Sequence, residues 1–315
     1  MISLDISIIG SGAVGKRTGC YFAEEEHNVI FYDVNREAFR GLPPKYKKTL
    51  DIYRAIKESE VSVVAVPTPL NRRRDGYDNS FLIAAAKACG KAMKEKGVRH
   101  AFILKSTVEP GTTRGVFVPS IEKSSTWQHP QNFDVWYVPE FLTVISDTWT
   151  KDGRFSVTPD TERVVIGAHR RESNKIYDSW ASSALYGDRP RKIVDYETAE
   201  AAKLLSNSRL PAAISFTNEV AELLDEINAR HNVGIDVDAA IEIVHSDPRI
   251  GKYGSVRAAV DVPGVGKGAY GGPCFSKDPP VLAGWLRKNS GKKSRIIEST
   301  IAVNEEMKNK YGVRE

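Results

Sequence analysis

The chain is poor in cysteine, with only Cys20, Cys89 and Cys274 among its 315 residues. Three thiols at such wide spacing are too few for a disulfide framework or a zinc site, so we expect no metal. The sequence also lacks a run of about 18 apolar residues, which argues against a membrane-spanning helix. Its first residues carry neither the basic nor the apolar segment of a secretory signal. These absences favour a cytoplasmic protein with no membrane partner.

The chain also lacks a strong excess of charge of one sign. The chain has 45 Lys and Arg residues against 40 Asp and Glu residues, a formal net charge of +5. Its densest basic clusters, Arg72-Arg73-Arg74 and Lys292-Lys293, are short, and short charge runs usually form a solvated surface. We therefore expect no nucleic-acid partner, although the small basic excess suits a phosphate-bearing small substrate.

Apolar segments of strand length alternate with amphipathic segments of helix length through the first half of the chain. The predicted strands are Ile6–Ile9, Val29–Tyr32, Val61–Val66, Ala101–Leu104, Val135–Val138 and Val164–Ile166, and the clearest helix is Phe81–Lys96. This alternation predicts an α/β fold with a doubly wound parallel sheet. Two irregular segments, Ser120–Asn132 and Thr143–Thr158, are predicted to be loops outside the sheet.

After Asp195 the strand pattern stops and helical patterns follow. They cover Glu197–Ala229, Val237–His245, Pro279–Lys288 and Arg295–Lys308, with the glycine-rich segment Asp247–Pro273 between the second and third. Pro211 lies inside the first helix and cannot donate to the carbonyl of Asn207, which predicts a bend there. We therefore divide the chain into a Rossmann-like domain, residues 1–190, and an α-helical domain with a long connecting helix, residues 191–315.

A glycine-rich turn links the first predicted strand to a helix, with the sequence Gly10-Ser11-Gly12-Ala13-Val14-Gly15. In a Rossmann fold such glycines permit a tight turn and a close approach of the backbone to a pyrophosphate, which lies at the helix N-terminus. The next strand ends at Asp33, where a carboxylate holds the ribose 2′-hydroxyl and repels the extra phosphate of NADP. This context predicts a site for NAD in preference to NADP, a preference that Arg36 can soften. An ordinary glycine turn is the alternative.

The most informative stretch surrounds the third cysteine and reads Tyr270-Gly271-Gly272-Pro273-Cys274-Phe275-Ser276-Lys277-Asp278. A helix is predicted to begin at Pro279, and its N-terminus, together with Lys277, would stabilise a thiolate on Cys274. Two structural alternatives stay open. Cys274 can be a small buried hydrophobic residue, and Asp278 can simply cap the helix.

This stretch resembles the GGxCFxKD active-site signature of the UDP-glucose/GDP-mannose dehydrogenase family, and other segments resemble family motifs in the same order. Along the chain they are Val66-Pro67-Thr68-Pro69 with Asp75-Gly76 and Asp78 (TP…DG..D), Ser106–Thr113 (STVxxGTT), Pro139–Leu142 (PEFL), Arg163–Gly167 (RxVxG), Glu200, Lys203, Asn207, Asn218 and Glu219 (ExxK…N…NE), and Asp247–Gly251 (DxRIG). The resemblance implies an NAD-dependent enzyme that oxidises the C6 alcohol of a nucleotide sugar, such as UDP-glucose, to the uronic acid. It also implies a homodimer formed around the long helix, with residues 191–315 as an α-helical dimerisation domain.

The resemblance further implies roles for particular side chains. Cys274 attacks the sugar aldehyde to give a thiohemiacetal, hydride transfer gives a thioester, and water releases the acid. Lys203 and Asn207, one turn apart on the long helix, stabilise the oxygen that becomes negative at C6. Three further residues position or deprotonate water: Asp278, Glu140 and Thr107.

The remaining contacts implied by the resemblance fall into two sets. The cofactor set adds Pro67, Thr68, Ser106, Thr107 and Lys277 to the glycine-rich turn, Asp33 and Arg36. The substrate set is Phe141, Leu142, Arg249, Tyr270, Gly271 and Gly272, with Arg249 reaching the sugar. From the residues alone, Lys203 and Asn207 can equally be solvated helix positions and Arg249 part of a surface ion pair. We expect the apolar residues of the long helix to be buried: Ile214, Phe216, Val220, Leu223 and Leu224.

The greatest departure from the family pattern is length. Family members continue into a second Rossmann-like domain that grips the nucleotide, and we expect this chain, which ends at Glu315, to lack it. Two rival functions therefore stay open. One is a dehydrogenase of a smaller hydroxy acid, against which Cys274 argues because oxidation of an alcohol to a ketone needs no thiol. The other is a non-catalytic or split NAD-binding homologue that needs a partner chain.

Overall fold

The computed structural model describes residues 3–141, 164–169, 191–246 and 269–311. The predictions for Leu142, Arg249, Arg163 and the loop at residues 143–158 lie outside the described residues. The chain forms two compact units. Unit 1 comprises Met1–Pro69, Tyr77–Val144 and Ser156–Lys203, and unit 2 comprises Leu70–Gly76, Ile145–Phe155 and Leu204–Glu315.

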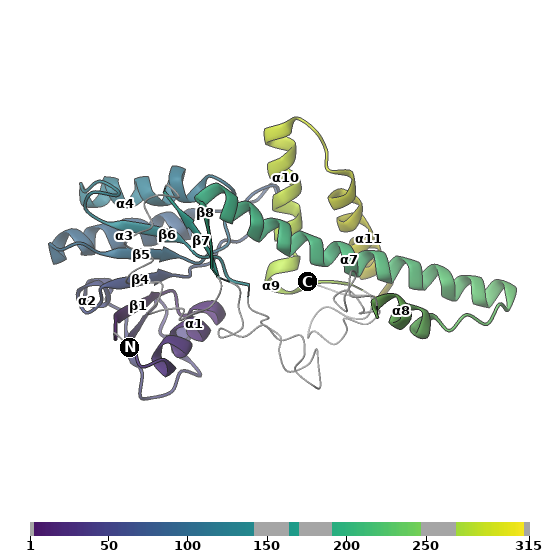
Figure 1. The fold of residues 1–315 in the computed structure, drawn as a ribbon, viewed down its shortest axis with the longest axis horizontal. Helices are drawn as coiled ribbons and strands as arrows, with labels where there is room; N and C mark the ends of the chain where they lie inside the picture. Colours follow the sequence, from purple (N-terminus) through teal and green to yellow (C-terminus); the bar gives the residue numbers. More distant parts are fainter. Residues whose placement is uncertain (1–2, 142–163, 170–190, 247–268, 312–315) are drawn as a thin grey trace. The chain divides into compact units, whose positions relative to one another are not determined.

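Unit 1 contains one mostly parallel sheet (Figure 1). Its described strands are β1 (Asp5–Ile9), β2 (Asn28–Tyr32), β3 (Lys47–Thr49), β4 (Val61–Val64), β5 (Ala101–Leu104), β6 (Asp134–Tyr137), β7 (Val164–Ala168) and β8 (Arg191–Asp195). They lie in the order β3-β2-β1-β4-β5-β6-β7-β8, and only β6 and β7 pair antiparallel. The order reverses at β1, so ligands are expected at the carboxyl ends of β1 and β4. The predicted α/β fold is confirmed.

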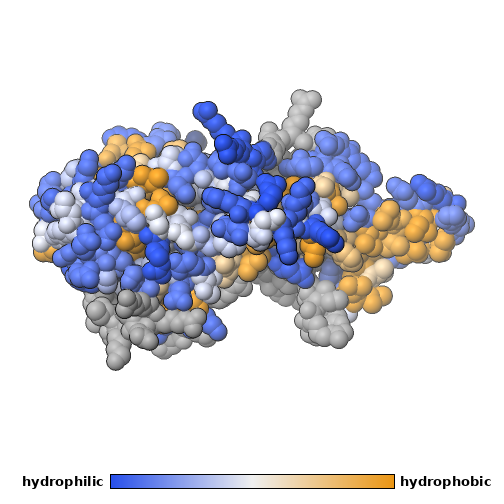
Figure 2. Space-filling view, turned by 90° about the horizontal axis from the view of Figure 1, so that it is seen from above, coloured by the Kyte–Doolittle hydropathy of each residue, from blue (hydrophilic) through white to orange (hydrophobic). Residues whose placement is uncertain are grey.

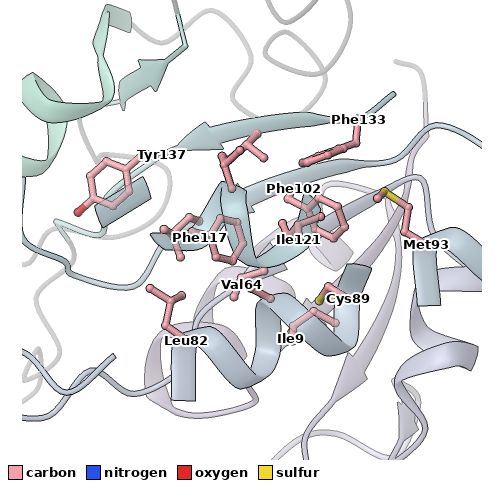
Figure 3. Packing of buried hydrophobic residues seen from close by; sticks show 14 of the residues in the cluster. Ile9, Val64, Leu82, Cys89, Met93, Phe102, Phe117, Ile121, Phe133 and Tyr137 are labelled. Atoms are coloured by element: carbon pink, nitrogen blue, oxygen red, sulfur yellow. The ribbon is translucent and has the colours of Figure 1, made fainter. Parts of the chain in front are cut away.

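Helices cover both faces of this sheet, and they differ in length. They are α1 (Ala13–Glu24), α2 (Ile52–Lys57), α3 (Ser80–Lys96) and α4 (Val118–Ser125), with a 3₁₀ turn at Arg36–Phe39 and a π-helical segment at Thr113–Phe117. On the α1 face, Phe22 packs against Ile8 and Phe31. On the other face, α3 contributes Leu82, Cys89 and Met93 to a cluster with Phe102 and Phe133 (Figure 3). Each large apolar side chain buried there stabilises the fold by about 1.5–3 kcal/mol.

The loop predicted at residues 120–132 is partly wrong, because α4 extends through Ser125. Serine favours turns, where its hydroxyl competes for backbone groups. Here the hydroxyls of Ser124 and Ser125 instead donate to carbonyls three or four residues back, at Ser120 and Ile121. Val118 and Ile121 are buried on the side that faces α3. Tertiary burial therefore overrides the weak local helix signal.

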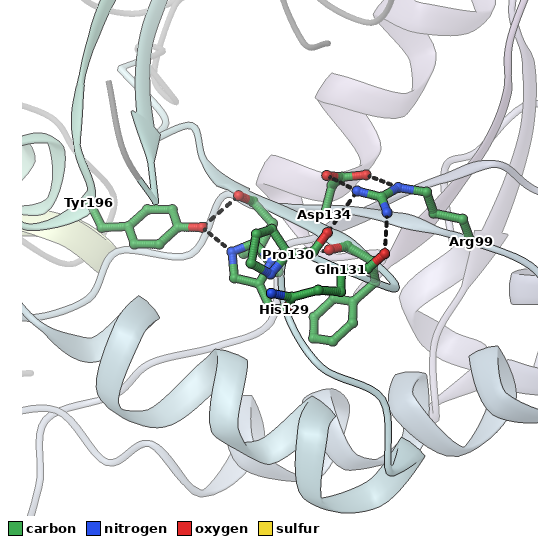
Figure 4. A network of polar contacts seen from close by, with 8 residues as sticks. Arg99, His129, Pro130, Gln131, Asp134 and Tyr196 are labelled. Atoms are coloured by element: carbon green, nitrogen blue, oxygen red, sulfur yellow. Dashed lines mark hydrogen bonds and ion pairs between the residues drawn. The ribbon is translucent and has the colours of Figure 1, made fainter. Parts of the chain in front are cut away.

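The first turn of the long helix α7 (Tyr196–His231) is fastened to the sheet within unit 1 (Figure 4). The buried Tyr196 hydroxyl donates to the carbonyl of Val135 on β6 at 2.7 Å, and His129 Nε2 lies 3.2 Å from the Tyr196 hydroxyl oxygen. Arg99 holds the neighbouring turn by donating to the carbonyls of Pro130 and Gln131, and it forms a two-pronged ion pair with Asp134 of β6. These contacts fix the part of α7 that carries Glu200 and Lys203.

The described residues of unit 2 from Leu204 onward form mainly helices, whereas its segment Leu70–Gly76 is a turn. From Leu204 onward α7 belongs to it, together with α8 (Val237–His245), α9 (Gly272–Phe275), α10 (Asp278–Ser290) and α11 (Arg295–Tyr311). The predicted helices are confirmed to within three residues at their ends, and α7 continues through Pro211. In the α7 stripe, Ile214 is buried as predicted, but Phe216 and Leu223 are 67% and 53% exposed. The single chain therefore leaves these two residues uncovered, and their burial in a dimer stays a prediction.

Candidate functional site

The glycine-rich turn of unit 1 connects β1 to α1 and uses its glycines in different ways. Gly10 has φ +97°, and a Cβ there would lie 2.6 Å from the carbonyl oxygen of Ala65. A Cβ on Gly15 would lie 1.9 Å from the carbonyl oxygen of Gly10. Gly12, directly before α1, has no atom of the described residues within 4 Å of such a Cβ. The turn is therefore compact on its protein side and open at Gly12, which fits the approach of a pyrophosphate.

Asp33 at the end of β2 is joined to this turn. Its Oδ2 accepts a hydrogen bond from the backbone N–H of Ser11 at 2.8 Å, and its Oδ1 accepts from Asn35 N–H at 2.9 Å. The half-buried carboxylate thus stands beside the turn, where the ribose of a dinucleotide would lie. Ala13 and Val14 form the first turn of α1, and the exposed Arg36 begins the 3₁₀ turn after Asp33.

The residues predicted after β4 and β5 meet at the carboxyl edge of the sheet. Thr68 Oγ1 donates to the carbonyl of Thr107 at 2.7 Å, and Ser106 Oγ donates to the carbonyl of Val66 at 2.7 Å. These two bonds tie the segments around Pro67 and Thr107 together beside the glycine-rich turn, because β4 pairs with β1. The structure therefore brings the predicted cofactor residues of unit 1 to one edge of the sheet.

Glu140 and Phe141, which follow β6, lie near two buried lysines. The Nζ of Lys105 is 3.4 Å from Oε2 of Glu140, and both side chains are buried. The Nζ of Lys203 on α7 lies 4.9 Å from the ring centroid of Phe141, a cation–π contact that helps to hold a buried ammonium. Lys203 is thus a buried side chain rather than a solvated helix position.

Glu200, one turn before Lys203, anchors the segment that follows Thr107. Its Oε2 accepts from the N–H of Gly111 at 2.6 Å and its Oε1 from the N–H of Thr113 at 2.8 Å. Burial raises the pKa of the Glu200 carboxyl, while the hydrogen bonds from Thr113 and Gly111 oppose that rise. The family motif contains Glu200, but its partners could not be identified from sequence.

In unit 2, Cys274 lies in the short helix α9 and is half-buried. The sequence placed it in a loop before a helix at Pro279, whereas α9 contains it and α10 begins one residue earlier, at Asp278. The preceding segment is held by Asn304 of α11, which accepts from Tyr270 N–H at 2.7 Å and donates to the Tyr270 carbonyl at 3.1 Å. Gly271 precedes α9, and Gly272 takes a left-handed φ of +78°.

Asp278 has both carboxylate oxygens engaged and no exposed surface. Asn207 Nδ2 donates to its Oδ2 at 2.5 Å, and Lys277 Nζ lies 2.6 Å from its Oδ1. These three predicted residues therefore form one chain of contacts. Asp278 is more than a helix cap, because its side chain links α10 to α7.

A cavity of about 390 Å³ lies in unit 2 beside the Cys274 segment. Tyr270, Phe275 and Ser276 line it, together with residues of α10 and α11 that include Arg287 and Glu298. In the part of the chain that the structure describes, no group of three or more His, Cys, Asp or Glu side chains could hold a metal ion. No helix of that part is long and apolar enough to cross a membrane.

Comparison with known proteins gives two matches to models of one family. The model described as "UDP-glucose/GDP-mannose dehydrogenase family, NAD binding domain" matches residues 41–185, and the model of that family's central domain matches residues 197–306. The first match begins after the glycine-rich turn. The match therefore does not include the turn, and the assignment of the turn to cofactor binding rests on its own geometry.

Individual relatives agree with these matches. UDP-glucose 6-dehydrogenase TuaD of Bacillus subtilis is 30% identical over 96% of this chain, which spans 63% of that protein. GDP-mannose 6-dehydrogenase of Pseudomonas aeruginosa is 26% identical over 93% of this chain and 70% of its own length. Among solved structures, a UDP-glucose dehydrogenase from the archaeon Pyrobaculum islandicum superposes with a TM-score of 0.76 at 26% identity, covering 98% of this chain and 69% of that one.

Proposed function

The chain belongs to the UDP-glucose/GDP-mannose dehydrogenase family, and we propose that it oxidises the C6 primary alcohol of a nucleotide sugar to a carboxylate. This proposal rests on two connected side-chain contacts, one between Asn207 and Asp278 and one between Asp278 and Lys277. Lys277 lies three residues after Cys274 in the sequence. An oxidation of an alcohol to a ketone needs neither a nucleophilic thiol nor a group that activates water. A four-electron oxidation to an acid through a thioester uses both.

NAD is the cofactor of the family's N-terminal domain, and when bound it accepts one hydride in each of two oxidations. We propose that the Gly10–Gly15 turn holds its pyrophosphate and that Asp33 holds the adenosine ribose. The open space at Gly12 and the place of Asp33 at the end of β2 support this assignment. Pro67, Thr68, Ser106 and Thr107 would line the same edge of the sheet.

Cys274 is proposed to be the nucleophile. Its sulfur adds to the carbonyl carbon of the C6 aldehyde, and loss of a hydride from that carbon leaves a thioester. Water then adds to the thioester carbonyl, the carbon–sulfur bond breaks, and the thiolate is released with the carboxylic acid. Over the whole reaction one alcohol, two NAD⁺ and one water give one carboxylate, two NADH and three protons.

Buried donors are proposed to stabilise the oxygen at C6 as it becomes negative. Lys203 supplies an ammonium held over Phe141, and Asn207 supplies an amide one turn further along α7. A fixed cation in a water-poor site stabilises an oxyanion strongly, because little reorganisation is needed when the charge develops. Asp278, Glu140 and Thr107 are proposed to position or deprotonate the water that attacks the thioester.

The substrate is tested by incubating the chain and NAD with UDP-glucose, GDP-mannose, UDP-N-acetylmannosamine and a set of small 2- and 3-hydroxy acids. NADH formation with a nucleotide sugar supports the proposal. NADH formation with the hydroxy acids alone would favour the first rival. NAD binding without any turnover would favour a split or non-catalytic homologue. This second candidate stays open because the chain spans only 63% of the length of the Bacillus relative.

We also propose that two copies of the chain associate through α7 and α8. Phe216, Leu223 and Ile227 recur at intervals of seven and four residues, so they share one face of α7, and all three are exposed. Ile243 and Val244 of α8 are exposed as well, and Figure 2 shows hydrophobic residues gathered over the end of α7 and over α8. Apolar patches of this kind usually mark an interface. Light scattering should give the mass of a dimer for the unmodified chain and of a monomer for Leu223→Asp. Phe81→Asp changes an exposed residue of unit 1 and is the control, which should remain a dimer.

A further inference from the structure

Lys105 is a buried lysine that has no role in the chemistry described above. It follows the last residue of β5 and is 3% exposed. Its Nζ lies 3.4 Å from Oε2 of Glu140, which is 6% exposed. It stands directly before Ser106 and Thr107, so it belongs to the same edge of the sheet as the predicted cofactor residues.

Backbone hydrogen bonds hold Lys105 directly and the chain just before Glu140. Lys105 N–H donates to the Val64 carbonyl on β4 at 2.8 Å, and Val138 N–H donates to the Leu104 carbonyl on β5 at 2.9 Å. Leu104 also pairs with Tyr137 in the register of β5 and β6. Lys105 therefore starts from a backbone bonded to β4, and Glu140 lies two residues beyond the backbone bond that joins Val138 to β5.

Because both side chains are buried, the charge next to each of them determines whether it stays ionised. A carboxylate removed from water takes up a proton unless an opposite charge lies close to it. Lys105 is such a charge for Glu140. The other buried ammonium near this segment, Lys203, contacts the ring of Phe141, the residue after Glu140. Lys203 thus contacts Phe141, and Lys105 is the lysine that forms an ion pair with Glu140.

We propose that Lys105 is a positioning residue that keeps Glu140 ionised and in place as the base for thioester hydrolysis. The inference rests on the proposed function, because it gives Glu140 one specific step. In that step an O–H bond of water breaks and its proton moves to the Glu140 carboxylate. The water oxygen bonds to the thioester carbonyl carbon, and the carbon–sulfur bond to Cys274 breaks with the electron pair on sulfur. Lys105 keeps its proton throughout.

The first test measures the pair itself and needs no substrate. Unfolding equilibria are compared for the unmodified chain, Lys105→Met, Glu140→Gln and the double variant. If the pair is formed, the double variant is more stable than independent effects predict, by roughly tenfold or more in the unfolding constant. Lys192→Met, at an exposed lysine of β8, is the control and should show no coupling with Glu140→Gln. Independent effects for Lys105 and Glu140 would overturn the inference whether or not the chain is active.

The second test separates positioning from mere stability, and it uses a nucleotide sugar that the unmodified chain oxidises. In Lys105→Met the acidic limb of the pH profile for acid formation should move to higher pH, because an unpaired buried carboxylate protonates more readily. Lys105→Arg, which keeps the charge, should restore the original limb. A lower rate with an unmoved limb in Lys105→Met would refute a role through Glu140. Absence of turnover by the unmodified chain, with coupling intact, would count against the proposed function instead.

Discussion

Asn207 on α7 donates a hydrogen bond of 2.5 Å to Oδ2 of Asp278 at the start of α10. Because Asp278 also contacts Lys277, its carboxylate has partners on both oxygens although the side chain is fully buried. An amide nitrogen carries two hydrogens, so Asn207 can bind Asp278 with one and a substrate oxygen with the other. Its position is therefore set by Asp278, and this dependence can be measured.

Replacing Asn207 with leucine keeps the side-chain size but leaves Oδ2 of Asp278 without this donor. We expect the free energy of unfolding to fall by about 1–3 kcal/mol, the usual cost of an unsatisfied buried group. Urea unfolding measures it. Asn289→Leu is the control, because the exposed Asn289 donates only to its own helix at Trp285. Equal losses in the two variants would mean that the Asn207–Asp278 bond contributes little.

The glycine-rich turn should separate stability from cofactor binding. Gly15→Ala places a methyl group against the Gly10 carbonyl, so we expect a loss of about 1–3 kcal/mol in stability. Gly12→Ala meets no described atom and should cost less than about 1 kcal/mol. If Gly12 faces the pyrophosphate, the same variant weakens NAD binding by about tenfold or more, equivalent to about 1.4 kcal/mol. Calorimetric titration with NAD decides, and unchanged affinity in Gly12→Ala would contradict the assignment.

Asp33 is expected to set the choice between NAD and NADP. Its carboxylate would bind the ribose hydroxyl of NAD and repel the 2′-phosphate of NADP. Asp33→Ala should therefore lower the ratio of kcat/KM with NAD to kcat/KM with NADP, mainly because kcat/KM with NAD falls. Because Asp33 also accepts from Ser11 N–H, the thermal stability of the variant must be measured alongside. Equal use of both cofactors by the unmodified chain would show that Asp33 does not face the ribose.

His100 should make stability depend on pH. It is buried between Ser62 and Lys96, and burial, assisted by the Lys96 charge, lowers its pKa to about 3. Between that value and an unfolded pKa of about 6.5, the unfolded chain binds a proton that the native chain does not. The free energy of unfolding should thus fall by up to about 1.4 kcal/mol per pH unit as pH drops below 6.5. Urea unfolding of the unmodified chain and His100→Gln between pH 7.5 and 5 tests this, since the variant should show the shallower slope.

Local patterns were sufficient for much of this fold. The glycine spacing from Gly10 to Gly15 and the acidic residue at Asp33 lie within a single strand–helix–strand segment, so their geometry follows from neighbours in sequence. The helical period of α7 likewise persists over many turns. The short strand β3 contains two lysines, and the edge strand β8 has only one buried residue. Neither carries an apolar pattern strong enough to predict it.

Contacts between distant segments could not be predicted in the same way. Lys105 and Glu140 meet because β5 and β6 are neighbours, and nothing in either segment indicates an ion pair. Asn207 and Asp278 form a hydrogen bond although they lie 71 residues apart in the sequence. The apolar stripe of α7 shows a similar limit, because periodicity indicates that Phe216 and Leu223 belong to one apolar face but does not show whether their own chain or a second copy covers them.

The central claim is that Cys274 carries the sugar through to the acid, and the number of NADH molecules released per substrate consumed tests it most directly. With an accepted nucleotide sugar, NADH absorbance and product mass should give two NADH for each carboxylate. Cys274→Ala should form no acid while binding NAD with unchanged affinity. One NADH per substrate with a ketone product, or an acid yield that survives Cys274→Ala, would contradict the account.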